Sequence, residues 1–366
     1  MIPIYNPYKI ETSINTVTQI LEEGWISWSG KYVTKCEAIL STILGCKYVL
    51  LTNSGTSATH CIVKSIKFKY PYCKKIYIPN SCYIAVYNCT LMEFKKEQIE
   101  ILPIDINTYN LDINYIQKLE KNAALFIVHN LGNTVNVIDI KSKRPDLIII
   151  EDNCEGFMGT YNNKKTGSEC LASSISFFAN KHITCGEGGA FCTNDLALYN
   201  YIKSYCRQGI TDEKFIHNKI ATNYRITNLQ AGLLYTQLNL LDEIIERKRY
   251  IINYYKKELE KVLNIKFQKI DKQTQHSYWI FSIRIINNPS YEIANSFFTE
   301  NNIETRPFFY DTSRHLHLKN LKTIECNNCK ILSREIIILP SFPNLKDNEL
   351  DYIITKVTEY SNSLNE

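Results

Sequence analysis

The sequence predicts an α/β protein, with a mostly parallel seven-stranded sheet and a smaller C-terminal α+β domain. Between about residues 35 and 240, short apolar runs recur without polar alternation, which is typical of strands buried on both faces. Segments with helical spacing separate these runs, so strands and helices alternate, as in a parallel sheet covered by helices. Later the pattern changes to long helices and alternating strand-like segments, which places a large domain over 1–244 and a small one over 245–366.

Each element follows from a local signal. The seven strands of the sheet are expected at 48–51, 75–78, 99–102, 125–128, 147–150, 174–178 and 189–192. The helices expected from apolar spacing are 57–67, one or two long helices over 229–259, 290–301 and 347–362. A further strand is expected over 278–283, where apolar and polar residues alternate.

Composition limits the class of protein. Of 366 residues, 45% are hydrophobic and 22% are charged, as in soluble globular proteins and unlike disordered chains. No run approaches 18 apolar residues, and the N-terminus lacks the features of a signal peptide, so we expect neither a membrane partner nor export. The net charge of +5 is not concentrated in one run, so nucleic acid is not an expected partner. Thirteen cysteines, an odd number, favour reduced thiols and a cytoplasmic location.

Cys326 and Cys329 form a C-x-x-C pair, and His315 and His317 lie upstream. A zinc site is conceivable there. A structural zinc site would need a second pair of ligands at suitable spacing, which the sequence does not complete. We therefore interpret the pair as two thiols in a loop, and no metal is predicted.

Three other segments carry candidate chemistry, each after a predicted strand, at the sheet edge where parallel sheets bind ligands. Residues 53–58 form a turn that opens a helix, which predicts either a phosphate site or an ordinary helix cap. Glu151 and Asp152 follow the strand over 147–150. They could bind a metal, pair with a protonated cofactor heteroatom, or lie in a solvated turn. Lys181 is either a desolvated nucleophile for carbonyls or a surface lysine.

Together, a phosphate-binding turn, an acid and a lysine are the groups that pyridoxal phosphate (PLP) needs. The phosphate anchors the ring, the carboxylate keeps the pyridine nitrogen protonated, and the lysine forms a Schiff base. Tyr83 follows the next strand and is placed to stack on the ring face. The combination therefore favours a PLP enzyme more strongly than any single segment does.

From about Pro3 to Leu350 the chain resembles the DegT/StrS sugar aminotransferases, which are fold-type I, PLP-dependent enzymes. The motifs that carry the resemblance are Gly24-Trp25-Ile26-Ser27 with Gly30, Asn53-Ser54-Gly55-Thr56, Ile78-Pro79 with Tyr83, Glu151-Asp152, Ser176-Phe177-Phe178, Asn180-Lys181, Thr184 to Gly189, and Asn223-Tyr224-Arg225. The order and spacing from Ser176 to Gly189 are specific. The loop over 130–133 departs from the family pattern, which affects expectations about the substrate but not about the cofactor.

The resemblance implies roles for individual residues. Lys181 is the implied catalytic residue, which holds the cofactor and moves the proton. The implied cofactor-binding residues are Lys181 itself, Gly55, Thr56 and Ser176 at the phosphate, Tyr83 on the ring, Asp152 at the pyridine nitrogen, Glu155 at the phenolic oxygen, and Asn223. The implied substrate-binding residues are Trp25, Ser27, His129, Arg306, Tyr310 and His315. Because Asn223 would reach the phosphate of a second subunit, the resemblance implies a homodimer with shared active sites.

One branch of this family carries histidine in place of the lysine and dehydrates its sugar. Lys181 lies five residues after Ser176 and five before Gly186, which is the lysine register, so His182 is only its neighbour. The resemblance therefore implies transamination. We expect L-glutamate to donate its amine to a nucleotide-linked 4-keto-6-deoxyhexose, as in perosamine and viosamine synthases, for glycan biosynthesis.

Several alternatives stay open. The nucleotide could be UDP, dTDP or GDP, and the enzyme could aminate a 3-keto sugar instead. A PLP-binding regulatory protein is a second alternative. An NAD-dependent sugar enzyme is disfavoured, because no G-x-G-x-x-G motif follows the first strand.

Overall fold

A computed structural model describes residues 1–213 and 215–364 of the chain. Its main feature is an eight-stranded sheet with the strand order β1-β9-β8-β5-β4-β2-β3-β14. The strands are β1 Tyr48–Thr52, β2 Ile76–Pro79, β3 Ile99–Leu102, β4 Ala124–Val128, β5 Ile148–Asp152, β8 Ala172–Ser176, β9 Gly189–Thr193 and β14 Lys322–Thr323. All seven predicted strands lie in this sheet, and a two-residue strand from the C-terminal part adds the eighth.

The sheet is mostly parallel, as predicted. Neighbouring strands from β8 to β14 pair in parallel, whereas β9 is antiparallel to both β1 and β8. Most strand boundaries differ from the prediction by one or two residues, and two of these differences bear on the site. Glu151 and Asp152 are the last residues of β5, because they continue its pairing with β4. The strand β8 ends at Ser176, so Phe177 and Phe178 already belong to the following loop.

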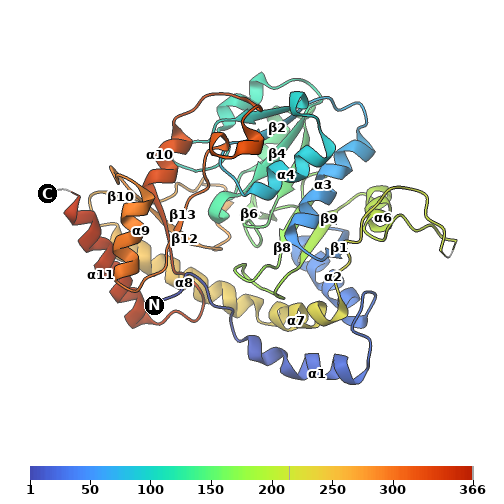
Figure 1. Ribbon diagram of the computed structural model, residues 1–366, viewed down its shortest axis with the longest axis horizontal. Helices are drawn as coiled ribbons and strands as arrows, with labels where there is room; N and C mark the ends of the chain where they lie inside the picture. The colour runs from blue at the N-terminus through green and yellow to red at the C-terminus, as the bar shows by residue number, and fades with distance from the viewer. Residues whose placement is uncertain (214, 365–366) are drawn as a thin grey trace.

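Helices cover both faces of this sheet (Figure 1). They are α1 Ile14–Glu22, α2 Lys31–Leu44, α3 Gly55–Lys69, α4 Ile84–Glu93, α5 Val137–Lys143, α6 Leu196–Tyr205, α7 Asn228–Asn239 and α8 Leu241–Leu259. Because side chains alternate along a strand, Leu50 of β1 packs into the core that contains α3 and α4. Its neighbours Val49 and Leu51 pack into the opposite core, with α2 and α7.

A second, antiparallel sheet forms the C-terminal part, with the order β10-β12-β15-β13. Its elements are β10 Ile265–Lys266, β12 Phe281–Ile285, β13 Arg306–Pro307 and β15 Ile336–Leu339, with the helices α9 Tyr291–Glu300, α10 Asn328–Glu335 and α11 Asp347–Ser363. Helices α8, α9 and α11 share an apolar core with it. The strand predicted over 278–283 begins three residues later, so the segment 278–280 precedes β12.

Three features connect the two sheets. Helices α7 and α8 follow one another from the main sheet to the smaller one (Figure 1), and α8 runs through the predicted domain boundary at residue 245, which stays a prediction. The N-terminus lies beside the C-terminal part, where Ile2 pairs with Ile303. A small third sheet joins β11 Thr274–Gln275 to the hairpin of β6 Thr160–Tyr161 and β7 Lys164–Lys165.

Three further findings bear on the expectations from the sequence. All thirteen cysteines are free thiols, and most are buried. Within the described part of the chain, no helix combines the length and the apolar character needed to cross a membrane. The same residues contain no group of three or more His, Cys, Asp or Glu side chains arranged to hold a metal ion.

Candidate active site

A cavity of about 550 Å³ lies at the carboxyl ends of β4, β5 and β8. The first turn of α3 and the start of α4 form one wall. Residues 178–181 form the floor, and residues 279–280 and 306–310 from the C-terminal part close the other side. The cavity therefore lies between the main sheet and the smaller one, at the sheet edge where the sequence predicted a ligand site.

The helix α3 presents its N-terminus to this cavity. Ser54 caps the helix, because its Oγ accepts the Ser57 N–H at 3.1 Å. The first N–H groups of a helix have no partner inside the helix, so those of Gly55 and Thr56 are available to an anion. A Cβ atom on Gly55 would lie 2.6 Å from the Ser176 Cβ, so only glycine lets this turn approach β8 so closely. The arrangement fits a phosphate group.

Two carboxylates reach the cavity from β5 and from the loop after it. Asp152 is buried and accepts the Cys154 N–H at Oδ1, 2.9 Å away. Glu155 is also buried, and its Oε2 accepts the Leu131 N–H at 2.8 Å. Burial raises the pKa of Glu155 to about 7, although Lys181 and the Leu131 N–H oppose the rise. Glu155 is therefore able to hold or release a proton near neutral pH.

Lys181 extends its amine into the same space. Its Nζ lies 3.9 Å from Glu155 Oε1 and 3.9 Å from the centre of the Trp279 ring. His182 points away from the cavity, is fully buried, and bonds through Nε2 to the Ser277 carbonyl at 2.8 Å. The structure therefore brings the lysine to the cavity and keeps the neighbouring histidine out of it.

Most of the predicted site residues meet at this cavity. Those that line it are Gly55, Thr56, Tyr83, Asp152, Glu155, Ser176, Lys181, Arg306, Tyr310 and His315. Tyr83 directly precedes α4, lines the cavity and is 55% exposed. These residues come from opposite ends of the chain, and the cavity is where they converge.

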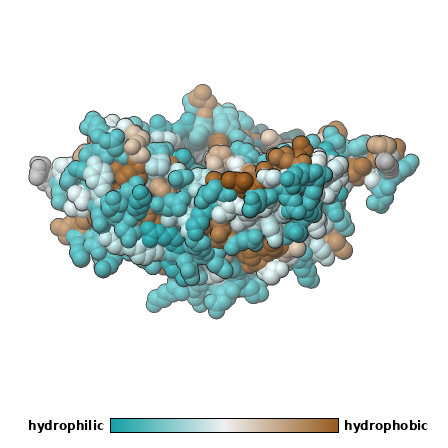
Figure 2. Space-filling model, turned by 90° about the horizontal axis from the view of Figure 1, so that it is seen from below, coloured by the Kyte–Doolittle hydropathy of each residue, from teal (hydrophilic) through white to brown (hydrophobic). Residues whose placement is uncertain are grey.

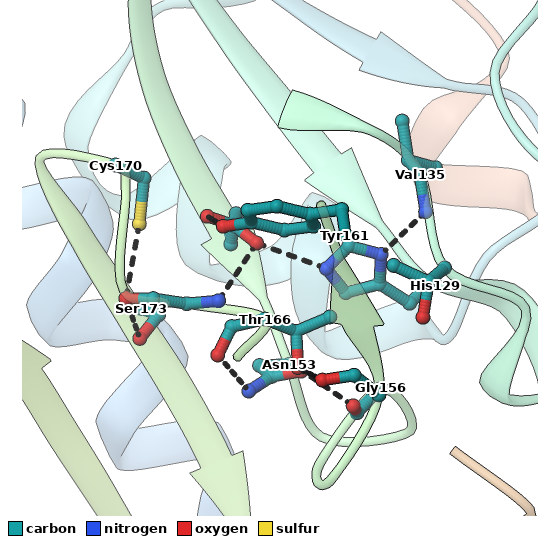
Figure 3. Close-up of polar contacts among 12 residues, drawn as sticks. His129, Val135, Asn153, Gly156, Tyr161, Thr166, Cys170 and Ser173 are labelled. Atoms are coloured by element: carbon teal, nitrogen blue, oxygen red, sulfur yellow. Dashed lines mark hydrogen bonds and ion pairs between the residues drawn. The ribbon is translucent and has the colours of Figure 1, made fainter. Parts of the chain in front are cut away.

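His129 is placed elsewhere. It is fully buried, and its Nδ1 accepts the Val135 N–H at 3.1 Å, which leaves Nε2 as the donor to Glu151 at 3.0 Å (Figure 3). Tyr161 and the Gly167 N–H donate to the same carboxylate, at 3.1 and 2.9 Å. With both ring nitrogens occupied by protein groups, His129 does not line the cavity, and the predicted contact with substrate finds no support in this geometry.

Trp25, Ser27 and Asn223 also lie outside the cavity of their own chain. Trp25 is 55% exposed, and its indole N–H donates to the Trp28 carbonyl at 2.9 Å. Asn223 is exposed at the base of a projecting segment, where its Oδ1 accepts from Arg225 Nε at 2.8 Å. The role predicted for Asn223 involves a second subunit, so it stays a prediction.

The sequence did not single out two aromatic residues near Lys181. Trp279 lies in the segment over 278–283 that the sequence predicts as a strand, yet it precedes β12, and its ring packs against the Lys181 amine. Tyr5 lies near the N-terminus, and its hydroxyl donates to the Lys181 carbonyl. Because both contacts join segments far apart in the chain, local patterns carry no signal for them.

The chain was compared with families of known proteins. Residues 7–358 match the DegT/DnrJ/EryC1/StrS aminotransferase family. The chain belongs to this family. By that membership it is an aminotransferase, and the family resemblance expected from the sequence is confirmed.

Relatives of known name lie mainly among sugar aminotransferases. The chain is 29% identical over 364 residues to a GDP-perosamine synthase of Escherichia coli O157:H7, covering 98% of each protein. It is 27% identical over 281 residues to a UDP-4-amino-4,6-dideoxy-N-acetyl-β-L-altrosamine transaminase of Campylobacter jejuni, covering 73% of each.

Solved structures share the fold. An aminotransferase of Helicobacter pylori involved in pseudoaminic acid biosynthesis superposes with a TM-score of 0.91, at 21% identity, over 98% of this chain and 99% of that one. An E. coli GDP-4-keto-6-deoxy-D-mannose-3-dehydratase with bound hydrated PLP superposes with a TM-score of 0.88, at 22% identity, over 97% and 100%. The predicted α/β fold class is confirmed by these likenesses.

Proposed function

We propose that this protein uses PLP to transfer the amine of L-glutamate to a nucleotide-linked 4-keto-6-deoxyhexose. The observation that carries the proposal is the presence of Lys181 in the cavity, beside two buried carboxylates and a helix N-terminus. PLP has a phosphate, a ring nitrogen and a phenolic oxygen, and the cavity offers one partner for each. When bound, the cofactor supplies an electron sink for the amine exchange.

The chain's own residues divide the work. The N–H groups of Gly55 and Thr56, with Ser176, hold the phosphate. Asp152 sits at the end of β5 and holds a proton on the ring nitrogen through its negative charge. Lys181 Nζ moves the proton at the reacting carbon. Glu155, whose Oε1 is 3.9 Å from that amine, would be the partner of the cofactor's phenolic oxygen.

The position of His182 favours transamination over dehydration. A histidine that replaced the lysine would have to enter the cavity, whereas His182 is buried and bonded to Ser277. Burial also lowers the pKa of His182 well below its usual range, so it is neutral at physiological pH. We therefore infer that Lys181 alone acts on the proton.

The sugar nucleotide is proposed to bind against the side of the cavity that the C-terminal part forms. Arg306 and His315 line that side, and Tyr310 lies between them in sequence. Arg306 is exposed on β13, so its guanidinium is available to a diphosphate. Relatives named GDP-perosamine synthase make GDP the first nucleotide to test, ahead of UDP and dTDP.

A homodimer is proposed on the basis of a projecting arm. Residues 207–213 and 215–223 project from the body beyond α6, and Arg207 pairs with Asn223 and Ile210 with His217 within this arm (Figure 1). Ile216 and Ile220 of this arm are exposed. Hydrophobic side chains also stand among hydrophilic ones on the face of the molecule that Figure 2 shows. A second subunit that covered Ile216 and Ile220 would bring Asn223 to the neighbouring site.

The free thiols are consistent with the predicted cytoplasmic location.

The decisive experiment offers the enzyme a panel of keto-sugar nucleotides with glutamate and PLP, and reads the products by mass spectrometry. The panel contains 4-keto and 3-keto sugars on GDP, UDP and dTDP. We expect exchange of the carbonyl oxygen for an amine on a 4-keto-6-deoxy sugar, with release of 2-oxoglutarate. Amination of only 3-keto sugars would replace the proposed acceptor. Cofactor binding with no spectral response to glutamate would favour a regulatory role.

A further inference from the structure

Two consecutive backbone carbonyls beside the reacting amine each accept a hydrogen bond from an aromatic side chain. The indole N–H of Trp279 donates to the Asn180 carbonyl at 2.9 Å. The hydroxyl of Tyr5 donates to the Lys181 carbonyl. Trp279 lies 99 residues after Asn180 in the sequence, and Tyr5 lies 176 residues before Lys181.

The loop itself has little structure of its own. Residues 177–188 contain no helix or strand. Few bonds hold the loop from within. The Lys181 N–H donates to the Phe178 carbonyl at 3.0 Å, and the Cys185 N–H and the Thr184 hydroxyl both donate to the Phe177 carbonyl at 3.1 Å. The orientation of the Lys181 side chain therefore depends on what fixes these carbonyls from outside. Trp279 contributes twice, since its ring also lies 3.9 Å beneath Nζ, where a cation is favoured.

Both donors lie next to residues that are bonded to other parts of the fold. Beside Tyr5, the Ile4 N–H donates to Glu304 at 2.9 Å, which ties the N-terminal segment to the C-terminal part. Beside Trp279, the Ser277 hydroxyl donates to the Glu155 carbonyl at 2.6 Å. Burial raises the pKa of Tyr5, so its hydroxyl remains a donor at any physiological pH. Each donor therefore links the loop to a segment that the fold already fixes.

We propose that Tyr5 and Trp279 are positioning residues, which hold the Asn180 and Lys181 carbonyls so that the Lys181 amine points at the cofactor's reacting carbon. Neither residue takes part in proton transfer. The proposal deepens the proposed function and rests on Lys181 being the reacting amine. It predicts that a substitution that removes either donor group but keeps an aromatic ring loosens the loop and misdirects the Lys181 amine.

The first test uses the cofactor-free protein, so it does not depend on catalysis. Tyr5→Phe removes only the hydroxyl, and Trp279→Phe removes the indole N–H but keeps an aromatic face. Tyr255→Phe is the matched control, because that buried hydroxyl donates to the Pro340 carbonyl at 2.9 Å, inside the C-terminal core. We expect backbone amides of 178–185 to exchange with deuterium about fivefold faster in each test variant, as the loss of one hydrogen bond predicts. Exchange there should be unchanged in Y255F.

The second test separates positioning from substrate binding in the PLP-loaded enzyme. We expect kcat to fall about tenfold in Y5F and W279F, with the KM for the sugar nucleotide unchanged within about twofold, because a misdirected amine slows the reaction without weakening binding. If loop exchange is faster in Y5F and W279F but the wild-type protein does not transaminate, the two residues still position the loop, and the proposed function is overturned. If the loop exchange and the kcat of Y5F and W279F equal those of Y255F, the positioning role is overturned. If W279F does not fold, the result for Y5F alone decides.

Discussion

The carboxylates of Glu151 and Asp152 are neighbours at the end of β5, and they serve opposite faces of the main sheet. Asp152 lines the cavity, whereas Glu151 accepts hydrogen bonds from His129, Tyr161 and Gly167 in the interior. The alternation of side chains along a strand separates the two acids. One dipeptide therefore supplies a charge for the site and an anchor for the loops behind it.

Replacing Lys181 tests the centre of the site. The variant Lys181→Ala should lose at least about a thousandfold in kcat, since the group that moves the proton is gone. In the wild type, reduction with borohydride and peptide mapping should locate the cofactor on Lys181. The exposed Lys141→Ala is the control and should behave as wild type. Retained multiple turnover in K181A would contradict the assignment.

Glu155 should make stability depend on pH. Its pKa is raised to about 7 in the folded protein from 4.5, so between these values the folded state binds more protons at this group than the unfolded chain does. The stability that it contributes is complete below pH 4.5 and is lost as pH rises through 7. The Glu155→Gln variant lacks this loss. The free energy of unfolding of E155Q relative to that of the wild type should therefore be about 1–3 kcal/mol higher at pH 8 than at pH 5.

Urea unfolding of the cofactor-free proteins at both pH values measures this difference. The Glu97→Gln variant provides the comparison, since that side chain is exposed in the short helix over 96–98. A gap between E155Q and the wild type that stays constant with pH would show that Glu155 is ionised throughout.

Gly55 is expected to tolerate no side chain. In Gly55→Ala the new Cβ would meet the Ser176 Cβ at 2.6 Å, so the turn must move away from β8. We expect a loss of about 1–3 kcal/mol in stability, as for other overpacked sites, together with at least about tenfold weaker PLP binding. Adding Ser176→Gly removes the clashing atom and should restore most of the stability. If it restores none, the close approach is not the cause.

His129 should matter for folding more than for substrate. His129→Ala removes a donor from the buried Glu151 carboxylate, which should cost about 2–3 kcal/mol of stability. The KM for the sugar nucleotide should change less than about twofold. His315→Ala is the matched comparison, because His315 lines the cavity, and it should raise KM with little loss of stability. A raised KM with unchanged stability in H129A would show instead that His129 contacts the substrate.

Mixed dimers can test the role of Asn223. Asn223→Ala and Lys181→Ala should each be inactive or nearly so as homodimers. If Asn223 serves the neighbouring site, a heterodimer of the two variants contains one site with both residues intact, and activity should reappear. Recovery to about half of the wild-type activity per dimer is expected. No recovery in verified heterodimers would place Asn223 in its own subunit's site.

Sequence patterns predicted much of the fold, because the sheet is built from locally encoded pieces. The strand ending at Val128 and the helix opening at Gly55 follow from apolar runs and a cap, which neighbours in sequence decide. The strands β5 and β12 were misplaced by a few residues, since pairing with a distant strand sets where they begin and end. Boundaries of this kind depend on tertiary contacts.

The same distinction applies to the site. Lys181 and Asp152, which line the cavity, could be predicted because each follows an apolar strand, and the family motifs mark their spacing. His129 follows a strand too, yet it turns toward Glu151 instead of the cavity, which no local pattern reveals. Trp279 and Tyr5 contact Lys181 only through the assembled fold.

The path of the N-terminal segment has a consequence for the order in which the molecule is made. The Ile4 N–H meets a carboxylate 300 residues further along the chain. During synthesis the first residues emerge long before this partner exists, so the bond that ties the segment beside Tyr5 to the C-terminal part forms only after Glu304 has been added. Lys181 is therefore present early in an incomplete setting. Completion of the site becomes a late event in the life of each new chain.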